Sequence, residues 1–213
     1  MLLRLLFVLF LSFAFTSVTA QYQHLLHKTH AERFVEIDSA FYNNKLVKLD
    51  SVTMFAILDK IGTMAQQNGD EELYLETELM RAFYYIIRDR EKLAKGEARL
   101  LELRDIADDK NMLQLQIRIR DKLGYYYYYL VHKHGPSFEN YLQLYQLSKK
   151  ISAKELPDKQ ELIANIGSAY FNFGDTEKAH LQTSYSRPLQ TGQSIILFYN
   201  LTVTHVNSAL SDS

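Results

Sequence analysis

Three histidines near the start of the chain, His24, His27 and His30, recur at every third position. Imidazole nitrogens bind divalent transition metals, so this spacing has to be considered as a metal site. On a helix, however, residues at this spacing spread over about 120° of the surface. No carboxylate lies four residues from any of them, which is the spacing that helical metal sites favour. We therefore predict no bound metal and no cofactor.

An acidic cluster follows at Glu71, Glu72, Glu76 and Glu78. Paired carboxylates can act as general acid and base. In a helix that begins at Asp70, however, Glu71 and Glu72 lie at the positive end of the helix dipole, where carboxylates are favourable. We therefore interpret the cluster as a solvated helix face.

Motifs of known catalytic sites are missing from the rest of the sequence. The chain has no Cys, which excludes disulfides, thiolate metal sites and a cysteine nucleophile. It contains no phosphate-cradling glycine loop, nucleophile elbow or two-histidine zinc helix. The formal net charge of −1 gives no electrostatic footprint for nucleic acid. The sequence therefore predicts a protein that is not an enzyme and does not bind nucleic acid.

Five consecutive tyrosines, Tyr125, Tyr126, Tyr127, Tyr128 and Tyr129, form the most unusual stretch of the chain. Five consecutive residues cover every side of a helix, so some of these rings must be buried and others exposed. Exposed tyrosines are rigid, amphipathic contact groups, and we predict that they bind a protein or peptide partner. The alternative is that all five pack between stacked helices, with their hydroxyl groups reaching water.

The first twenty residues have the layout of a secretory signal. Arg4 supplies the positive start, residues 5–15 are apolar, and Val18 and Ala20 are the small residues before a cleavage site after Ala20. An uncleaved membrane anchor is the alternative, because the apolar run of about 17 residues is at the lower limit for a membrane span. We predict an exported protein, periplasmic or secreted, that meets the membrane only through this segment if it is uncleaved. A chain without Cys fits a bacterial envelope better than a small secreted eukaryotic domain.

The mature chain is predicted to be all-helical. Its 8 Gly and 3 Pro are too few for the many tight turns of an all-β fold. Residues 21–48 are interpreted as an N-terminal cap or loose lead-in, in which Leu25, Phe34 and Ile37 could share a helix face. After this lead-in, apolar spacing and N-cap residues predict helices that begin at Asp50 or Ser51, at Asp70, at Lys92, after Asn111, near Phe138 and at Asp158. Stop signals are expected at Asn68-Gly69, at 108–111 and at Gly135-Pro136.

One segment has two readings. Leu113, Leu115, Ile117 and Ile119 alternate with polar residues, which is typical of a strand. The same segment also fits a helical stripe that continues to Leu123. We predict a helix, because no second strand is available for pairing and a lone strand is not stable.

The sequence predicts two helical hairpins that repeat along the chain. Ile61-x-x-Met64-Ala65 matches Leu103-x-x-Ile106-Ala107 at an offset of 42, and a polar turn follows each. In the second helices, Leu73 and Leu79 match Leu113 and Ile119 at an offset of 40. Such hairpins cannot bury both faces alone, so neighbouring hairpins must stack.

A third hairpin carries a family resemblance. The stretch Ile163-x-x-Ile166-Gly167-x-x-Tyr170, followed by 173–175 and 177–179, resembles the tetratricopeptide repeat. The resemblance implies an α-solenoid of antiparallel helix hairpins wound into a right-handed superhelix. It places the concave, partner-binding positions at Asn165, Ser168, Phe171 and Asn172, together with Glu161 and Ala164. Relatives that clamp a chaperone's C-terminal carboxylate have Lys and Asn where this chain has Ala164 and Ser168, so we do not expect that ligand.

These elements predict a domain order and a function. The order is a signal peptide (1–20), a lead-in or cap (21–48), hairpins like tetratricopeptide repeats (49–156), the clearest repeat (157–192) and a partial repeat or capping helix (193–213). The exported, Tyr-rich repeats resemble the sensory halves of Bacteroidetes signalling proteins, which implies a non-catalytic module that binds a protein or peptide in the cell envelope. Two alternatives are the N-terminal fragment of a histidine kinase or regulator that contains such repeats, and an exported helical enzyme.

Overall fold

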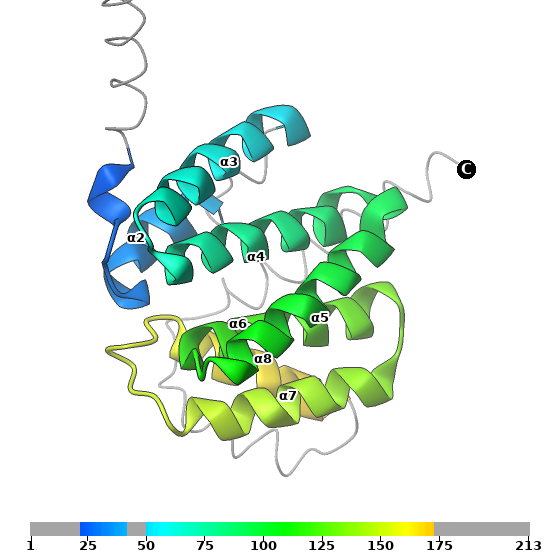
Figure 1. Cartoon of the computed structure of the whole chain (residues 1–213). Coiled ribbons are helices and arrows are strands. Elements are labelled where there is room, and N and C mark those ends of the chain that lie inside the picture. The colour runs from blue at the N-terminus through cyan, green and yellow to red at the C-terminus, as the bar shows by residue number, and fades with distance from the viewer. Residues whose placement is uncertain (1–21, 42–49, 173–213) are drawn as a thin grey trace, which may run out of the picture. The chain divides into compact units, whose positions relative to one another are not determined.

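All elements that the structure describes are helical. The computed structural model describes residues 22–41 and 50–172, which form seven α-helices and three shorter helical turns (Figure 1). The α-helices are α2 (His30–Phe41), α3 (Ser51–Gln67), α4 (Glu71–Arg88), α5 (Leu93–Asp109), α6 (Leu113–Tyr125), α7 (His134–Ser148) and α8 (Lys159–Asn172). The short turns are η1 (Gln23–Leu25), η2 (Arg90–Lys92) and the π-helical turn η3 (Tyr126–Leu130). The predicted all-helical class is therefore confirmed for these residues.

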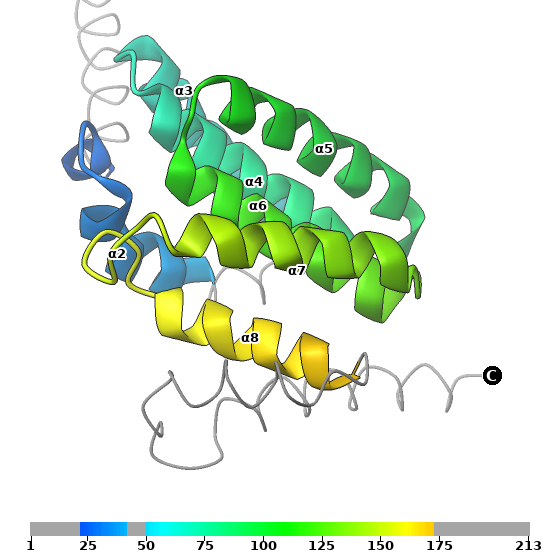
Figure 2. The same cartoon turned by 90° about the horizontal axis from the view of Figure 1, so that it is seen from below.

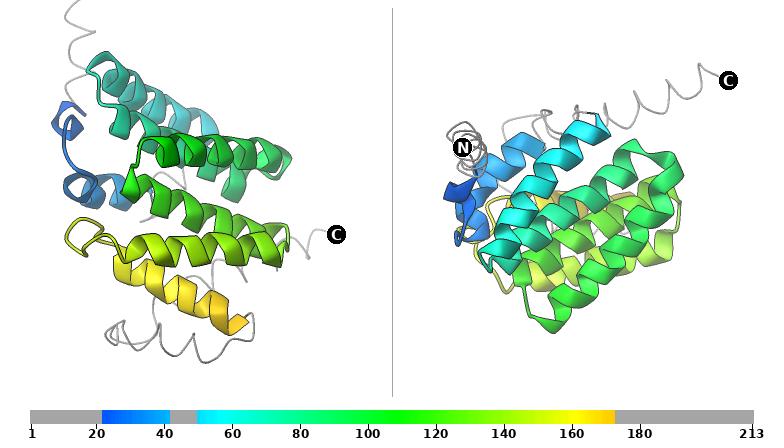
Figure 3. Two further views of the ribbon diagram at one scale, coloured as in Figure 1. Left: turned by 60° about the horizontal axis from the view of Figure 1, so that its bottom comes forward. Right: turned by 45° about the horizontal axis from the view of Figure 1, so that its top comes forward.

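The chain divides into two compact units, 1–162 and 163–213. In the first unit, α3 to α7 follow one another as neighbours, each packed against the helix before and the helix after it (Figures 1 and 3). In the second unit, only the part of α8 from Ile163 to Asn172 is described. The predicted signal peptide and partial last repeat lie outside the described residues.

Local capping fixes where the helices begin. Asp50 precedes α3, and its Oδ1 accepts a hydrogen bond from the backbone N–H of Thr53 at 2.9 Å. Thr29 and Glu32 form a capping box at the start of α2, because the Glu32 carboxylate accepts from the Thr29 backbone N–H at 2.8 Å. Both caps satisfy donors that the first turn of a helix leaves free.

The two hairpin turns α3–α4 and α5–α6 have the same geometry. The N–H of Asp70 bonds to the carbonyl of Ala65 at 2.9 Å, and the N–H of Met112 bonds to that of Ala107 at 3.0 Å. Between them, Gly69 and Asn111 have φ values of 70° and 53°, the left-handed conformation that ends many helices. Equivalent residues of the two turns are therefore 42 positions apart, as in the first helices of the hairpins, and the second helices begin at the same offset. The offset of 40 expected for the second helices is wrong by two residues.

The segment 113–119 is helical, so the strand reading is wrong for it. Its strand-like alternation has a physical cause: every residue of α6 from Leu115 to Asp121 is buried, the polar ones included. A helix that is covered on all sides loses the single apolar stripe by which a sequence reveals it. Gly124 lies where α6 meets α7, and an added Cβ there would come within 2.8 Å of the Tyr141 ring.

The N-terminal lead-in is not loose over the residues described. Leu25 and Ile37 are buried in the same apolar core as Met54, Leu58 and Leu73. The expected helix end at Gly135-Pro136 is also wrong, because both residues lie in the first turn of α7. Proline is tolerated there because the first turn needs no N–H donor from it. Across the described residues, none of the helices combines the length and the apolar character needed to cross a membrane.

Candidate functional site in a buried charge network

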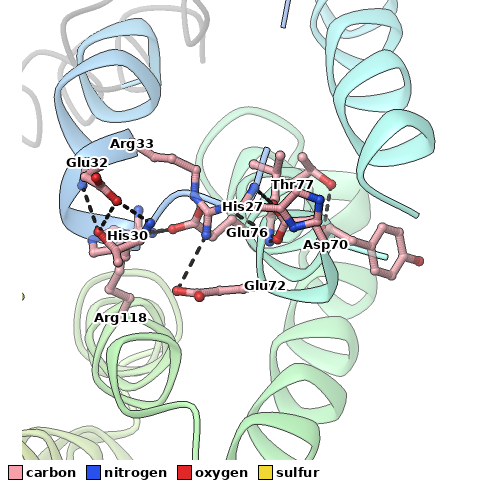
Figure 4. A network of polar contacts seen from close by, with 12 residues as sticks. His27, His30, Glu32, Arg33, Asp70, Glu72, Glu76, Thr77 and Arg118 are labelled. Atoms are coloured by element: carbon pink, nitrogen blue, oxygen red, sulfur yellow. Dashed lines mark hydrogen bonds and ion pairs between the residues drawn. The ribbon is translucent and has the colours of Figure 1, made fainter. Parts of the chain in front are cut away.

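Charged side chains from α2, α4 and α6 meet in the interior of the first unit (Figure 4). The first contributor is Asp70, which caps the start of α4. Its Oδ1 accepts from the Leu73 backbone N–H at 3.1 Å, and its Oδ2 accepts from the His27 backbone N–H at 2.7 Å. Asp70 therefore caps α4 and also holds the backbone of the segment that leads into α2.

Arg33 of α2 is the centre of the network. Its side chain is 0% exposed and meets three carboxylates. Nη1 lies 3.2 Å from Asp70 Oδ2, Nε lies 3.1 Å from Glu76 Oε2, and Nη2 lies 3.6 Å from Glu72 Oε1. The planar guanidinium can address several carboxylates at once, which a lysine ammonium cannot do in the same way.

Glu76 of α4 is the second central residue. Its side chain is 1% exposed, and its Oε1 lies 2.5 Å from His30 Nδ1 and 3.2 Å from Arg118 Nη1. Burial alone would raise the pKa of Glu76, but the His30 hydrogen bond and the Arg118 charge outweigh it and lower that pKa below its usual value. The carboxylate therefore stays ionised inside the protein.

The predicted solvated acidic face is wrong for Glu76. Glu71 does lie at the surface, where Lys110 Nζ binds it at 2.7 Å, and Glu78 pairs with Arg99 at 2.8 Å. Glu72 lies at the edge of the network, and partial burial raises its pKa above the usual value despite the Arg33 charge. The spacing of these carboxylates along α4 does not show which of them is buried. Their different environments depend on contacts with residues far along the chain.

The three histidines have three different environments. His24 Nε2 lies 2.6 Å from Glu36 at the surface, and His27 contributes its backbone N–H to Asp70. His30 is 2% exposed, and its Nε2 is buried without a hydrogen-bond partner. Within the described part of the chain, no three His, Asp or Glu side chains are grouped so as to hold a metal ion.

The tyrosine run is divided between core and surface. Tyr126 and Tyr127 are buried in η3, and their hydroxyl groups donate to the two oxygens of Glu97 at 2.8 and 2.9 Å. Burial, followed by the hydrogen bond to Glu97, raises the pKa of Tyr127 to about 12 and raises that of Tyr126 still further. These two residues fasten η3 to α5.

Tyr125, Tyr128 and Tyr129 are partly exposed and form what we call the aromatic cluster. The ring centroids of Tyr125 and Tyr129 are 5.1 Å apart, and those of Tyr128 and Tyr129 are 4.7 Å apart. The His134 ring lies 5.3 Å from Tyr128. The run thus contains two buried and three partly buried rings, and partner binding by the latter stays a prediction.

The other predicted partner-binding residues belong to the second unit. Asn165 and Ser168 are partly buried on α8, and the Ser168 hydroxyl donates to the Ala164 carbonyl at 3.1 Å. The side chains of Phe171 and Asn172 lie outside the described residues. Because each unit is described by itself, these residues and the tyrosines stay two separate predictions.

Sequence reasoning missed Arg33, Arg118 and Glu97. A signal existed for Arg33, which lies four residues before Ile37 and therefore on the apolar side of α2. An arginine on that side needs a buried acidic partner. The positions of those partners, 37 and 43 residues later, could not be read from local spacing.

No protein-family model, no curated protein and no solved structure matches this chain. The resemblance to tetratricopeptide repeats therefore stays a prediction, and function has to be argued from the side chains themselves.

Proposed function

We propose that this chain is a non-catalytic helical repeat module that binds a protein or peptide partner in the cell envelope. The observation that carries the proposal is the aromatic cluster: three partly exposed tyrosines held at one end of a buried helix. Tyrosine is enriched among the residues that dominate binding energy, because a rigid ring contributes a large contact area at little entropic cost.

The local backbone supports this reading. The cluster spans the end of α6 and the π-helical turn η3, and π-helical turns occur frequently at functional sites. Tyr126 and Tyr127 hold that turn against Glu97. The partly exposed rings are therefore presented by a fixed backbone, which lowers the entropy lost on binding.

The repeated hairpins support the class of protein. Their identical turns at a 42-residue offset are what a stack of similar units requires. We propose that the hairpins form an α-solenoid of the tetratricopeptide kind, with Asn165, Ser168, Phe171 and Asn172 on its concave side. An exported sensory module of a signalling protein is the biological setting that this proposal favours.

The charge network speaks against a catalytic role for its residues. The Glu76 side chain is 1% exposed, and its carboxylate faces His30, Arg33 and Arg118 in the interior of the first unit and not a solvent-accessible surface. A general base needs a free lone pair within hydrogen-bond reach of its substrate. In this arrangement Glu76 faces other side chains of the protein and is not within reach of a substrate.

Affinity capture from an envelope extract tests the proposal. The wild-type chain is expected to retain a specific partner, and the double variant Tyr128→Ala, Tyr129→Ala is expected to retain at least tenfold less of it. Leu142→Ala is the matched control, because Leu142 is also a large exposed side chain of the first unit. Equal retention by the double variant, with its helical circular dichroism unchanged, contradicts the proposal.

A further inference from the structure

Over residues 30–37, whose side chains the structure describes, α2 meets α4 and α6 through several charged side chains. Among its described residues the buried ones are His30, Arg33 and Ile37, two of which are polar. Its opposite side faces solvent, where Val35 is 75% exposed. By contrast, α4 buries Leu73, Leu75 and Leu79 with many others. The binding of α2 therefore depends on ion pairs to an unusual degree.

The surface that receives α2 has a defined chemistry. Asp70, Glu72 and Glu76 come from the start of α4, and Arg118 comes from α6. Without α2, Glu76 would keep Arg118 but lose His30 and Arg33. Three carboxylates would then face a single arginine, which is a surface suited to accept one further guanidinium group.

We propose that this α4–α6 face is a binding site for an arginine-bearing helix, and that α2 is a ligand which the chain supplies to itself. The inference goes beyond the proposed function, because it concerns a second site, separate from the aromatic cluster, and names what that site binds. The partner is a helix that matches α2, with a histidine three residues before the arginine and an aliphatic residue four after it, as in His30, Arg33 and Ile37.

Energetics favour exchange of α2 for such a partner. The attraction within a buried ion pair is largely offset by the loss of hydration, so its net contribution is small. An arginine on another helix could also make the contacts that Arg33 makes with Asp70, Glu72 and Glu76. An empty site, in contrast, would leave Asp70, Glu72 and Glu76 close together with only Arg118 to balance their charge, so a helix that carries an arginine is favoured over an empty face.

A labelled peptide with the sequence of residues 22–41 tests the proposal on the full chain. Fluorescence anisotropy is expected to show at least tenfold tighter binding to the Arg33→Ala chain than to the wild-type chain, whose own α2 fills the site. Lys28→Ala is the matched control, since Lys28 is an exposed cation of the same segment, and should behave as the wild type. Adding Glu76→Gln to Arg33→Ala should abolish binding.

A second variant, Arg33→Lys, keeps a cation in the buried site but not its fork of donors. It is expected to bind the peptide more tightly than the wild type, by a smaller factor than Arg33→Ala. The proposal is overturned if neither variant binds better than the wild type. It is also overturned if Arg33→Lys loses its helical circular dichroism, because α2 would then be required for folding. Neither result affects the capture experiment, which depends on the aromatic cluster.

Discussion

At the scale of single residues, Glu76 shows how a buried charge is tolerated. It lies among His30, Arg33 and Arg118, and removing one partner of such a group leaves the others uncompensated. We expect Glu76→Gln to lower the free energy of unfolding by about 3 kcal/mol, measured by urea denaturation. Glu71→Gln, which breaks an exposed pair with Lys110, should change it by less than about 1 kcal/mol. Equal losses would contradict the account.

From the lowered pKa of Glu76 we predict how the stability of the protein changes in acid. The pKa of Glu76 is lowered in the folded state from its usual value of 4.5, so its contribution to stability is present above pH 4.5 and is lost as pH falls through the folded pKa. Urea midpoints measured on the acid side should therefore fall less steeply for Glu76→Gln than for the wild type. Glu72 has a raised pKa, so Glu72→Gln should have the opposite effect. A wild-type slope in both variants would show that neither carboxylate is coupled to folding.

From the raised pKa values of the buried tyrosines we predict a loss of stability at alkaline pH. The pKa of Tyr127 is raised from 10.0 to about 12, so the stability that its hydroxyl contributes is present below pH 10 and is lost as pH rises toward 12. Ultraviolet titration of tyrosinate should show that Tyr127→Phe removes a late-titrating group. A late-titrating group of unchanged size in Tyr127→Phe would contradict the assignment.

At the scale of elements, close helix contacts depend on glycine. A Cβ added at Gly96 would lie 2.7 Å from Ile86 Cγ1 and 2.9 Å from the Ala82 carbonyl oxygen, where α4 meets α5. Gly96→Ala should therefore destabilise the protein by about 1 to 3 kcal/mol through overpacking, although alanine is the better helix former. Gly135→Ala, where an added Cβ meets nothing within 4 Å, should be neutral or slightly stabilising. Thermal denaturation of the two variants tests this prediction, and an equal midpoint temperature for both would contradict it.

Elements with local signals could be predicted from the sequence. Asp50, Asp70 and the turn at Asn68-Gly69 placed α3 and the start of α4 within a residue of their observed positions. The end of α6 was misplaced, because Gly135-Pro136 can stop one helix or begin another. Here Tyr126–Leu130 forms a π-helical turn, and α7 already begins at His134.

The candidate site was harder to predict than the fold. Its ion pairs join α2 to residues far along the chain, and no periodicity links Arg33 to Glu76 or His30 to Arg118. The surface tyrosines were recognised because one run contained them all. Their division into the buried Tyr126 and Tyr127 and the partly exposed aromatic cluster required knowledge of where Glu97 lies.

At the scale of the whole molecule, we propose a scaffold in which repeated hairpins present aromatic side chains to a partner. The equivalent turns at Gly69 and Asn111 give the first unit its regularity. The buried charges join α2 to α4 and α6. The central claim of the proposal is that this protein functions by holding a partner.

Site-specific photo-crosslinking in intact cells tests this central claim most directly. A photoreactive residue at Tyr129 is expected to capture one discrete protein partner, whereas the same residue at Val52, which is 78% exposed on α3, should capture none or only a diffuse background. The same diffuse products at both positions, from chains with unchanged circular dichroism, would contradict the claim that this protein functions by holding a partner.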